Sequence, residues 1–129
     1  MQYSFGRLTY SGYNRKRKKN DISGQIKSAC DYIAIHIKEK LSITQLARQA
    51  GYTEYYFSHK FKNEIGYSVS DYIKREKIRQ AKLLLSGTQM SIQEISDELS
   101  FGSRSYFSSS FKRNGIVTQT KYREHNIKL

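Results

Sequence analysis

The sequence contains no proline and no tryptophan, and only one of its 129 residues is cysteine. A single cysteine cannot form a disulfide within the chain, which fits the reducing cytoplasm. No apolar run approaches the roughly 18 residues that suggest a membrane span, and the N-terminal residues lack the apolar core of a signal peptide. Because proline is absent and apolar residues recur at spacings of three and four, we expect a mostly helical chain.

Acidic residues are also scarce. The chain has 11 Asp and Glu against 23 Lys and Arg, which gives a formal net charge of +12. This excess favours a polyanionic partner, either nucleic acid or an acidic membrane surface, over a charge that serves solubility alone. Residues 1–20 hold six of the positive charges and no acid. We interpret them as a basic flexible arm or linker remnant, which either contacts phosphates or is a solvated tail.

The most informative feature is a pattern that occurs twice. Residues 41–62 read LSITQLARQAGYTEYYFSHKFK, and residues 90–112 read MSIQEISDELSFGSRSYFSSSFK, with one extra residue after the turn. The aligned pairs include Ser42 and Ser91, Leu46 and Ile95, Tyr52 and Phe101, Phe57 and Phe107, and Phe61 and Phe111. A short helix, a tight turn and a second helix, given twice, predicts two helix-turn-helix units of the kind that enters a DNA groove.

Apolar stripes and capping residues predict where the first helices begin. A helix is expected over 24–40, because its apolar residues recur on one face. The residues of that stripe are Ile26, Ala29, Cys30, Ile33 and Ile37. Ser42 with Gln45, and Ser91 with Glu94, are expected to form capping boxes at the starts of the two short helices.

Two recognition helices are expected over about 53–64 and 103–113, with their phenylalanines inward and their polar residues outward. One long helix is expected between the copies, beginning at its cap Ser68 and ending before its cap Gly87. Its length of roughly 27 Å can hold two recognition helices about one DNA turn apart. A last short helix is expected near Thr118.

The repeat divides the chain into four parts. They are a basic arm over 1–20, a first helix-turn-helix subdomain over 21–67, a linking helix over 68–87 and a second subdomain over 88–129. We expect each subdomain to carry one recognition helix.

Signatures of enzymes and metal sites do not appear in the sequence. His36, His59 and His125 lack metal-ligand spacing with one another, with Cys30 or with a pair of carboxylates. There is no glycine-rich phosphate loop, and no local motif arranges Ser, His and Asp as nucleophile and base. We therefore predict a protein that is not an enzyme and that needs no metal or cofactor.

Three segments and the closing pair Tyr122 and Arg123 resemble the DNA-binding domain of the AraC/XylS family of bacterial transcription regulators. The segments are LARQAGYTEYYFSHKFKNEIG, SVSDYIKREKIRQAKLLL and IQEISDELSFGSRSYFSSSFKR. The resemblance covers about 24–124. It implies an all-α, homeodomain-like fold of seven helices, in which a long central helix joins two helix-turn-helix subdomains. It also implies that both recognition helices enter adjacent major grooves.

The resemblance points to DNA contacts on the two recognition helices and at two other helix starts, where backbone amides favour phosphate. The residues are Thr53, Glu54, Tyr55, Ser58, His59 and Lys62 in the first copy, Ser103, Arg104, Ser105, Ser108, Ser109 and Lys112 in the second, and Ser68 and Thr118. We expect Arg104 to lie on the side of its helix away from the phenylalanines and to read guanine, with a phosphate contact as the alternative.

The second copy departs from the family pattern. Ser100 stands where the first copy has Gly51, and it adopts a positive φ less readily, so we expect Gly102 to compensate. Ser109 stands where the family often has arginine, which predicts a weaker grip on DNA. The prolines usual near the starts of the fourth and seventh helices are missing.

The function predicted is sequence-specific binding of double-stranded DNA by a bacterial transcription regulator, in the cytoplasm and on the nucleoid. RNA polymerase, and a sensor or dimerisation domain outside this chain, are further partners that the resemblance implies. One alternative is an RNA-binding module, although the stacking motifs and sheet signatures of such modules are missing. Another is a protein-interaction domain whose basic charge is incidental.

Overall fold

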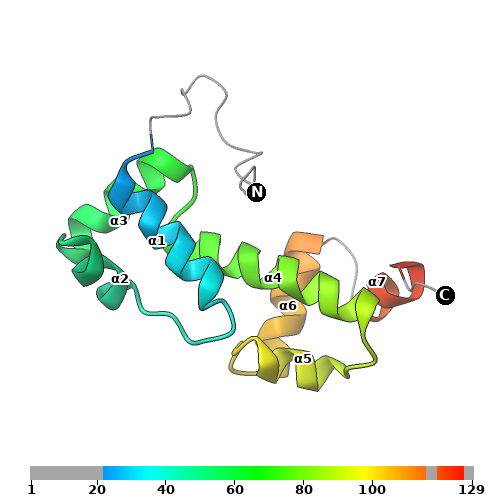
Figure 1. The fold of residues 1–129 in the computed structure, drawn as a ribbon. Helices are drawn as coiled ribbons and strands as arrows, with labels where there is room; N and C mark the ends of the chain where they lie inside the picture. Colours follow the sequence, from blue (N-terminus) through cyan, green and yellow to red (C-terminus); the bar gives the residue numbers. More distant parts are fainter. Residues whose placement is uncertain (1–21, 116–118, 127–129) are drawn as a thin grey trace. The chain divides into compact units, whose positions relative to one another are not determined.

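The structure, a computed structural model, describes residues 22–115 and 119–126. Within these ranges the chain forms seven helices and no strand (Figure 1). The helices are α1 (Gly24–Ile35), α2 (Ile43–Ala50), α3 (Glu54–Ile65), α4 (Val69–Gly87), α5 (Ile92–Glu98), α6 (Arg104–Gly115) and α7 (Gln119–Asn126). The all-α fold that the sequence predicts is confirmed for the described residues.

The described residues divide into two compact units. One contains residues 22–32 and 42–71, and the other contains residues 33–41 and the described residues from Tyr72 onward. Each unit holds one pair of helices joined by a tight turn, α2 with α3 in the first and α5 with α6 in the second. The helices α1 and α4 each run from one unit into the other.

In the first unit, the buried side chains include those that the sequence predicts to pack inward from α1 and α3. Phe57 and Phe61 of α3 are fully buried, with ring centroids 5.8 Å apart. Cys30 is buried and forms no disulfide, as expected for a residue of the apolar stripe. The other buried apolar residues of this unit are Ile26, Ala29, Leu46, Ala47, Ile65 and Val69.

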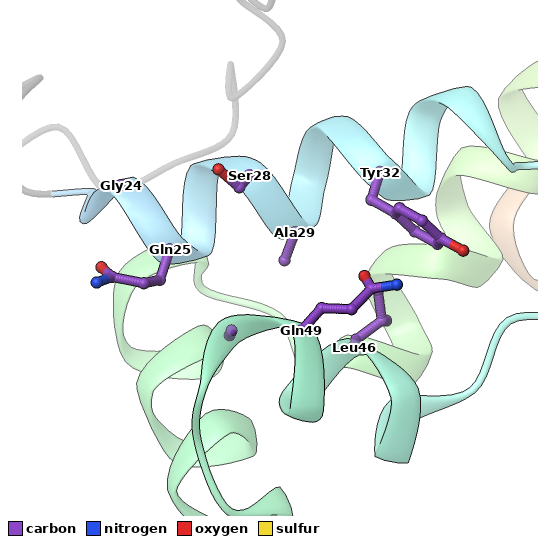
Figure 2. Close-up of a pocket in the computed structure, with 8 residues that line it drawn as sticks. Gly24, Gln25, Ser28, Ala29, Tyr32, Leu46 and Gln49 are labelled. Carbon is purple, nitrogen blue, oxygen red and sulfur yellow. The ribbon is translucent and has the colours of Figure 1, made fainter.

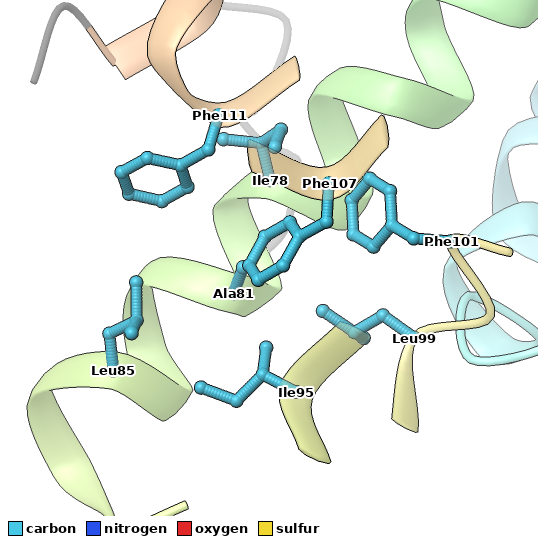
Figure 3. Close-up of a cluster of buried hydrophobic side chains, with 8 residues drawn as sticks. All are labelled: Ile78, Ala81, Leu85, Ile95, Leu99, Phe101, Phe107 and Phe111. Carbon is cyan, nitrogen blue, oxygen red and sulfur yellow. The ribbon is translucent and has the colours of Figure 1, made fainter. Parts of the chain in front are cut away.

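The second unit has a cluster of buried side chains drawn from α4, α5, α6 and the turn between α5 and α6 (Figure 3). The ring of Phe107 stacks on Phe101 at 4.7 Å and meets Phe111 edge to face at 6.0 Å. Tyr122 of α7 packs edge to face on Phe111 at 5.7 Å. The remaining members of the cluster are Ile78, Ala81, Leu85, Ile95 and Leu99.

The two short helices begin at the predicted serine caps. Ser91 and Glu94 form the complete capping box, since each side chain accepts a hydrogen bond from the backbone N–H of the other residue (3.0 and 2.8 Å). In the first copy the hydroxyl of Ser42 accepts from the N–H of Gln45 (3.2 Å). The side chain of Gln45 donates instead to the hydroxyl of Tyr32 (3.3 Å), so the structure shows only the serine half of the expected box.

Helix α1 ends at Ile35, five residues earlier than the sequence predicts. The chain then turns, and the N–H of Glu39 donates to the carbonyl oxygen of His36 (2.9 Å). The carbonyl groups of Ile37 and Glu39 accept hydrogen bonds from a side chain of α4, not from later amides of α1. The stripe residue Ile37 is still buried, but it packs from the connection that follows the helix.

The side chain of α4 that binds these carbonyl groups belongs to Lys77, which is only 7% exposed. Its ammonium group donates to the carbonyl oxygens of Ile37 (2.6 Å), Glu39 (2.9 Å) and Leu99 (2.5 Å). Three carbonyl acceptors match the three N–H donors of an ammonium group, so the buried charge is fully hydrogen-bonded. Burial lowers the pKa of Lys77 to about 8, and the Glu39 carboxylate opposes this effect. The lysine therefore ties α4 to the α1–α2 connection and to the end of α5.

The turn of the second copy takes the same backbone form as the first, although it lacks the glycine. Gly51 has a φ of 80°, and Ser100 has a φ of 54°, the only positive φ of a non-glycine residue in the described ranges. Gly102 also has a positive φ, but it does not relieve Ser100 as expected. The hydroxyl of Ser100 donates to the carbonyl oxygen of Lys38 (2.6 Å), and Lys38 pairs with Glu98 (2.7 Å). These contacts offset the strain of the left-handed backbone.

Helix α4 starts as predicted and ends slightly differently. The hydroxyl of Ser68 accepts from the N–H of Asp71 (3.2 Å), which is the expected cap. Gly87 is the last helical residue and does not adopt the left-handed cap conformation. The N–H and the hydroxyl of Thr88 both donate to the carbonyl oxygen of Leu84 (3.1 and 2.6 Å), so threonine completes this end.

Because both rings are fully buried, Phe61→Ala and Phe111→Ala should each lower the free energy of unfolding by roughly 3–5 kcal/mol. Denaturant unfolding of the purified variants measures this. Tyr55→Ala is the matched control, since the ring of Tyr55 is 75% exposed and its loss should change stability little. An unchanged unfolding free energy in either phenylalanine variant would contradict the assignment of the core.

Removal of the buried ammonium should also destabilise the fold. Lys77→Met should lower the free energy of unfolding by about 3 kcal/mol or more, because three buried carbonyl groups lose their donor. Arg79→Met is the control, since Arg79 lies on the same helix with a side chain 60% exposed and should cost under about 0.5 kcal/mol. Equal stability losses in the two variants would show that Lys77 does not anchor the connection.

Candidate nucleic-acid interface

The first recognition helix, α3, is fixed in rotation by its buried phenylalanines. Thr53 caps its start by accepting from the N–H of Tyr56 (3.1 Å), and Gly66 ends it with a φ of 96°. Because Phe57 and Phe61 lie four residues apart and point inward, the residues on the opposite side of α3 face outward.

The outward face of α3 carries an aromatic pair. The ring of Tyr55 lies 4.3 Å from that of His59, and Tyr55 is 75% exposed. Lys62 is exposed one turn further along, and Ser58 is partly buried at the edge of the face. The structure thus brings together four of the predicted contact residues on one side of one helix.

The two predicted residues at the start of α3 are partly engaged within the protein. The hydroxyl of Thr53 serves as the helix cap. The carboxylate of Glu54 accepts a hydrogen bond from the hydroxyl of Thr44 on α2. Glu54 therefore connects the two helices of the motif, although both it and Thr53 remain exposed.

The second recognition helix, α6, begins after Ser103, whose hydroxyl accepts from the N–H of Tyr106 (3.0 Å). Arg104 is the first helical residue and is exposed. The expectation that it lies opposite the phenylalanines is wrong, because positions 104, 107 and 111 follow the spacing of one helical face. Arg104 is exposed because it stands in the first turn, at the N-terminal end of that face.

The serines of α6 are less available than the sequence suggests. The hydroxyl of Ser109 donates to the carbonyl oxygens of Ser105 (3.1 Å) and Tyr106 (3.3 Å). The hydroxyl of Ser108 accepts from the side-chain amide of Gln119 on α7 (3.0 Å). Among the described residues, the exposed hydroxyl of Ser105 has no such bond, and Lys112 is exposed near the end of the helix.

Of the two predicted helix-start sites, the structure describes Ser68 but not Thr118. Ser68 caps α4 with its hydroxyl, as predicted, and is partly buried. Thr118 lies outside the described residues. Gln119, the first residue of α7, is 6% exposed.

Sequence reasoning missed one exposed tyrosine on each recognition helix. Tyr56 is 50% exposed and Tyr106 is 47% exposed. Each lies near a lysine ammonium, Lys60 for Tyr56 and Lys74 for Tyr106 (both 5.9 Å to the ring centroid). The one-residue shift between the copies already pairs the two tyrosines in the sequence, and this pairing was the available signal.

Arg123 explains part of the closing motif. Its guanidinium group donates to the carbonyl oxygens of Leu85 (2.9 Å) and Met90 (2.5 Å). It therefore fastens α7 to the end of α4 and the segment that follows. This role is structural and does not depend on DNA.

A pocket of about 720 Å³ lies between α1 and α2, and none of its lining residues belongs to α3 (Figure 2). Ala29, Leu46 and Ala50 provide apolar surface, and the other lining residues are Gly24, Gln25, Ser28, Tyr32 and Gln49. None of these side chains is charged, so the pocket offers no cation for a polyanionic ligand.

No group of three or more His, Cys, Asp or Glu residues is placed to hold a metal ion within the ranges that the structure describes. No helix within the same ranges is both long enough and apolar enough to cross a membrane.

Comparison with known proteins identifies the class to which the fold and its outward faces belong. A family model described as "Helix-turn-helix domain" matches residues 46–125. The C-terminal domain of AraT, a response regulator from Geobacillus stearothermophilus, matches with a TM-score of 0.80 and 25% identity over 84% of this chain and 91% of that chain.

Two curated relatives are similar in sequence. An uncharacterized helix-turn-helix-type transcriptional regulator of Staphylococcus aureus is 31% identical over 99 residues, which are 77% of this chain and 13% of that protein. The arabinose operon regulatory protein of Salmonella typhimurium is 30% identical over 103 residues, which are 79% of this chain and 37% of that protein. The chain belongs to the AraC-type helix-turn-helix family, and it spans about an eighth of the length of the staphylococcal relative.

Proposed function

We propose that this chain is the sequence-specific, double-stranded DNA-binding domain of a bacterial transcription regulator. The observation that carries the proposal is the same construction in both units. In each, buried phenylalanines fix the rotation of the second helix of the motif and leave polar side chains outward. The family and the net charge of +12 support a polyanionic partner.

In this proposal the outward face of α3 lies in a major groove. Tyr55 and His59, whose rings are in tilted contact, meet base edges, and Lys62 contacts phosphate. Ser58, Thr53 and Glu54 lie at the margins of that contact.

The outward face of α6 enters the adjacent major groove in the same proposal. The first residues of a recognition helix are those that reach base edges in helix-turn-helix proteins, which suits Arg104 and Ser105. Lys112 provides a phosphate contact, while Ser103, Ser108 and Ser109 contribute less because their hydroxyls are engaged within the protein. In the same proposal, the starts of α4, after its cap Ser68, and of α7, at Gln119 next to Thr118 in the sequence, present backbone amides to phosphates.

The remaining parts of the proposal concern the wider assembly. The division into an arm (1–20), two subdomains (21–67 and 88–129) and a linking helix (68–87) assigns one half-site to each subdomain. The chain acts without catalysis, in the cytoplasm on the nucleoid, together with RNA polymerase and with a sensor or dimerisation domain. Relatives that are much longer than this chain support the last point.

Salt dependence is the first test of this function. Duplexes that the chain prefers are selected from a random library, and their affinity is measured at several salt concentrations. If six to eight phosphates are contacted, the slope of log K against log salt should be about −5 to −7. Footprinting of the selected duplex should show protection over about two turns on one face of the helix.

The competing functions give different results. Stronger competition by RNA than by duplex DNA at one salt concentration would favour an RNA-binding module. A slope near zero would show that the basic charge is incidental and that the partner is a protein. Protection of a single groove would mean that one recognition helix does not engage.

Arg104 gives the sharpest residue-level prediction. If its guanidinium group contacts the O6 and N7 atoms of guanine, Arg104→Ala should weaken binding by about 1–3 kcal/mol and relax preference at one base pair. Affinity is measured on the selected duplex and on its single-base variants. Uniform weakening, with preference unchanged and the salt slope reduced by about 1, would assign Arg104 to phosphate instead.

Arg113→Ala is the matched control for charge. Arg113 is exposed in the last turn of α6, so its loss removes one positive charge without touching the first turn. Its removal should leave base preference unchanged. A change of preference at the same base pair in both variants would count against a specific contact by Arg104.

A further inference from the structure

Each recognition helix carries a half-exposed tyrosine beside the residues assigned to base contact. In the first unit the ring of Tyr56 packs edge to face against Tyr52, with centroids 4.8 Å apart. The ammonium group of Lys60 lies 5.9 Å from the centroid of the Tyr56 ring. One aromatic neighbour and one cation therefore hold this ring in place.

The second unit builds the same arrangement from different parts. The ring of Tyr106 is tilted against Phe101 of the turn, at 6.0 Å between centroids. The ammonium group of Lys74 lies 5.9 Å from the Tyr106 ring, but this lysine comes from α4 and not from the recognition helix. The two lysine ammonium groups lie at the same distance from equivalent tyrosine rings, although the two lysines occupy unrelated positions in the sequence.

Core packing does not account for these tyrosines. Their exposed fractions are 50% and 47%, and within the described residues neither hydroxyl forms a hydrogen bond. Tyr56 follows Tyr55, and Tyr106 follows Ser105, the residues at which the two outward faces start. Because one residue turns an α-helix by about 100°, each tyrosine lies about 100° further round its helix. A helix lying in a major groove has the DNA backbone along its flanks. Tyr56 and Tyr106 lie on such a flank of their helices.

We propose that Tyr56 with Lys60, and Tyr106 with Lys74, are two phosphate-contacting pairs that seat the recognition helices on the DNA backbone. The proposal rests on the proposed function and adds residues that it does not include. The tyrosine hydroxyl donates a hydrogen bond to a non-bridging phosphate oxygen, and the lysine ammonium compensates the charge of the phosphodiester.

The two pairs should not be equally strong. Lys60 also pairs with the carboxylate of Glu64 at 3.0 Å, and Glu64 accepts from the N–H of Ser23 (2.7 Å). The Glu64 carboxylate therefore already balances part of the charge that Lys60 can offer to a phosphate. Lys74 has no ion pair among the described residues, so the second pair should contribute more of the electrostatic contact.

Removal of single hydroxyl groups tests the tyrosines. Tyr56→Phe and Tyr106→Phe keep the rings and should each weaken binding about tenfold, equally for preferred and unrelated duplexes, with the salt slope unchanged. Tyr32→Phe is the matched control, because that hydroxyl accepts from Gln45 beside the α1–α2 pocket and should not affect affinity. Thermal unfolding followed by circular dichroism verifies that all variants remain folded.

Neutral substitutions test the lysines. Lys74→Gln should reduce the magnitude of the salt slope by about 1, and Lys60→Gln should reduce it by less because Glu64 already balances Lys60. Equal changes in the two slopes would contradict the ranking of the pairs.

The outcomes separate this proposal from the function on which it rests. If the unaltered chain binds no duplex in a salt-dependent manner, the DNA-binding function itself fails. If the unaltered chain binds, and Tyr56→Phe and Tyr106→Phe bind with the same affinity, only the phosphate-contacting pairs are overturned. Weakening confined to the preferred duplex would also overturn them, since it would assign the tyrosines to base contact.

Discussion

The burial of two phenylalanines four residues apart on each recognition helix is the constraint on which the rest of this structure depends. Phe57 with Phe61, and Phe107 with Phe111, are fully buried, and burial of such rings stabilises a small domain by several kcal/mol per residue. Rotation of either helix would expose them. The same apolar contacts that hold each unit together therefore determine which polar side chains face outward.

The second unit reaches the same form by different local means. Its turn lacks glycine, so Ser100 adopts a left-handed backbone that costs about 1–2 kcal/mol for a residue with a Cβ atom. The hydroxyl of Ser100 and the ammonium group of Lys77 both bond to carbonyl groups of the α1–α2 connection. Those carbonyl groups are available to the two side chains because α1 ends early, at Ile35. The strained turn, the early end of α1 and the buried lysine are thus linked through hydrogen bonds to the same connection.

The two outward faces have the same position in the motif but differ in chemistry. The first carries an aromatic pair, in which the rings of Tyr55 and His59 are tilted against each other. On the second, two serine hydroxyls already bond within the protein, since Ser109 donates to its own helix and Ser108 accepts from Gln119. In the proposed function, base readout by the second unit is therefore assigned to Arg104 and Ser105, and contacts to the DNA backbone are given more weight there.

The sequence by itself determined the helices, the repeat and the buried aromatic residues, because hydrophobic spacing and serine caps act over a few neighbouring residues. It also identified the outward face of α3 as a candidate site. Only the tertiary structure decided where α1 ends, that Lys77 is buried and which serines of α6 are engaged. Each of these depends on groups far apart in the chain, such as Lys77 and Ile37, whose contact no local pattern encodes. Packing, not propensity, gives a carbonyl or a hydroxyl its partner.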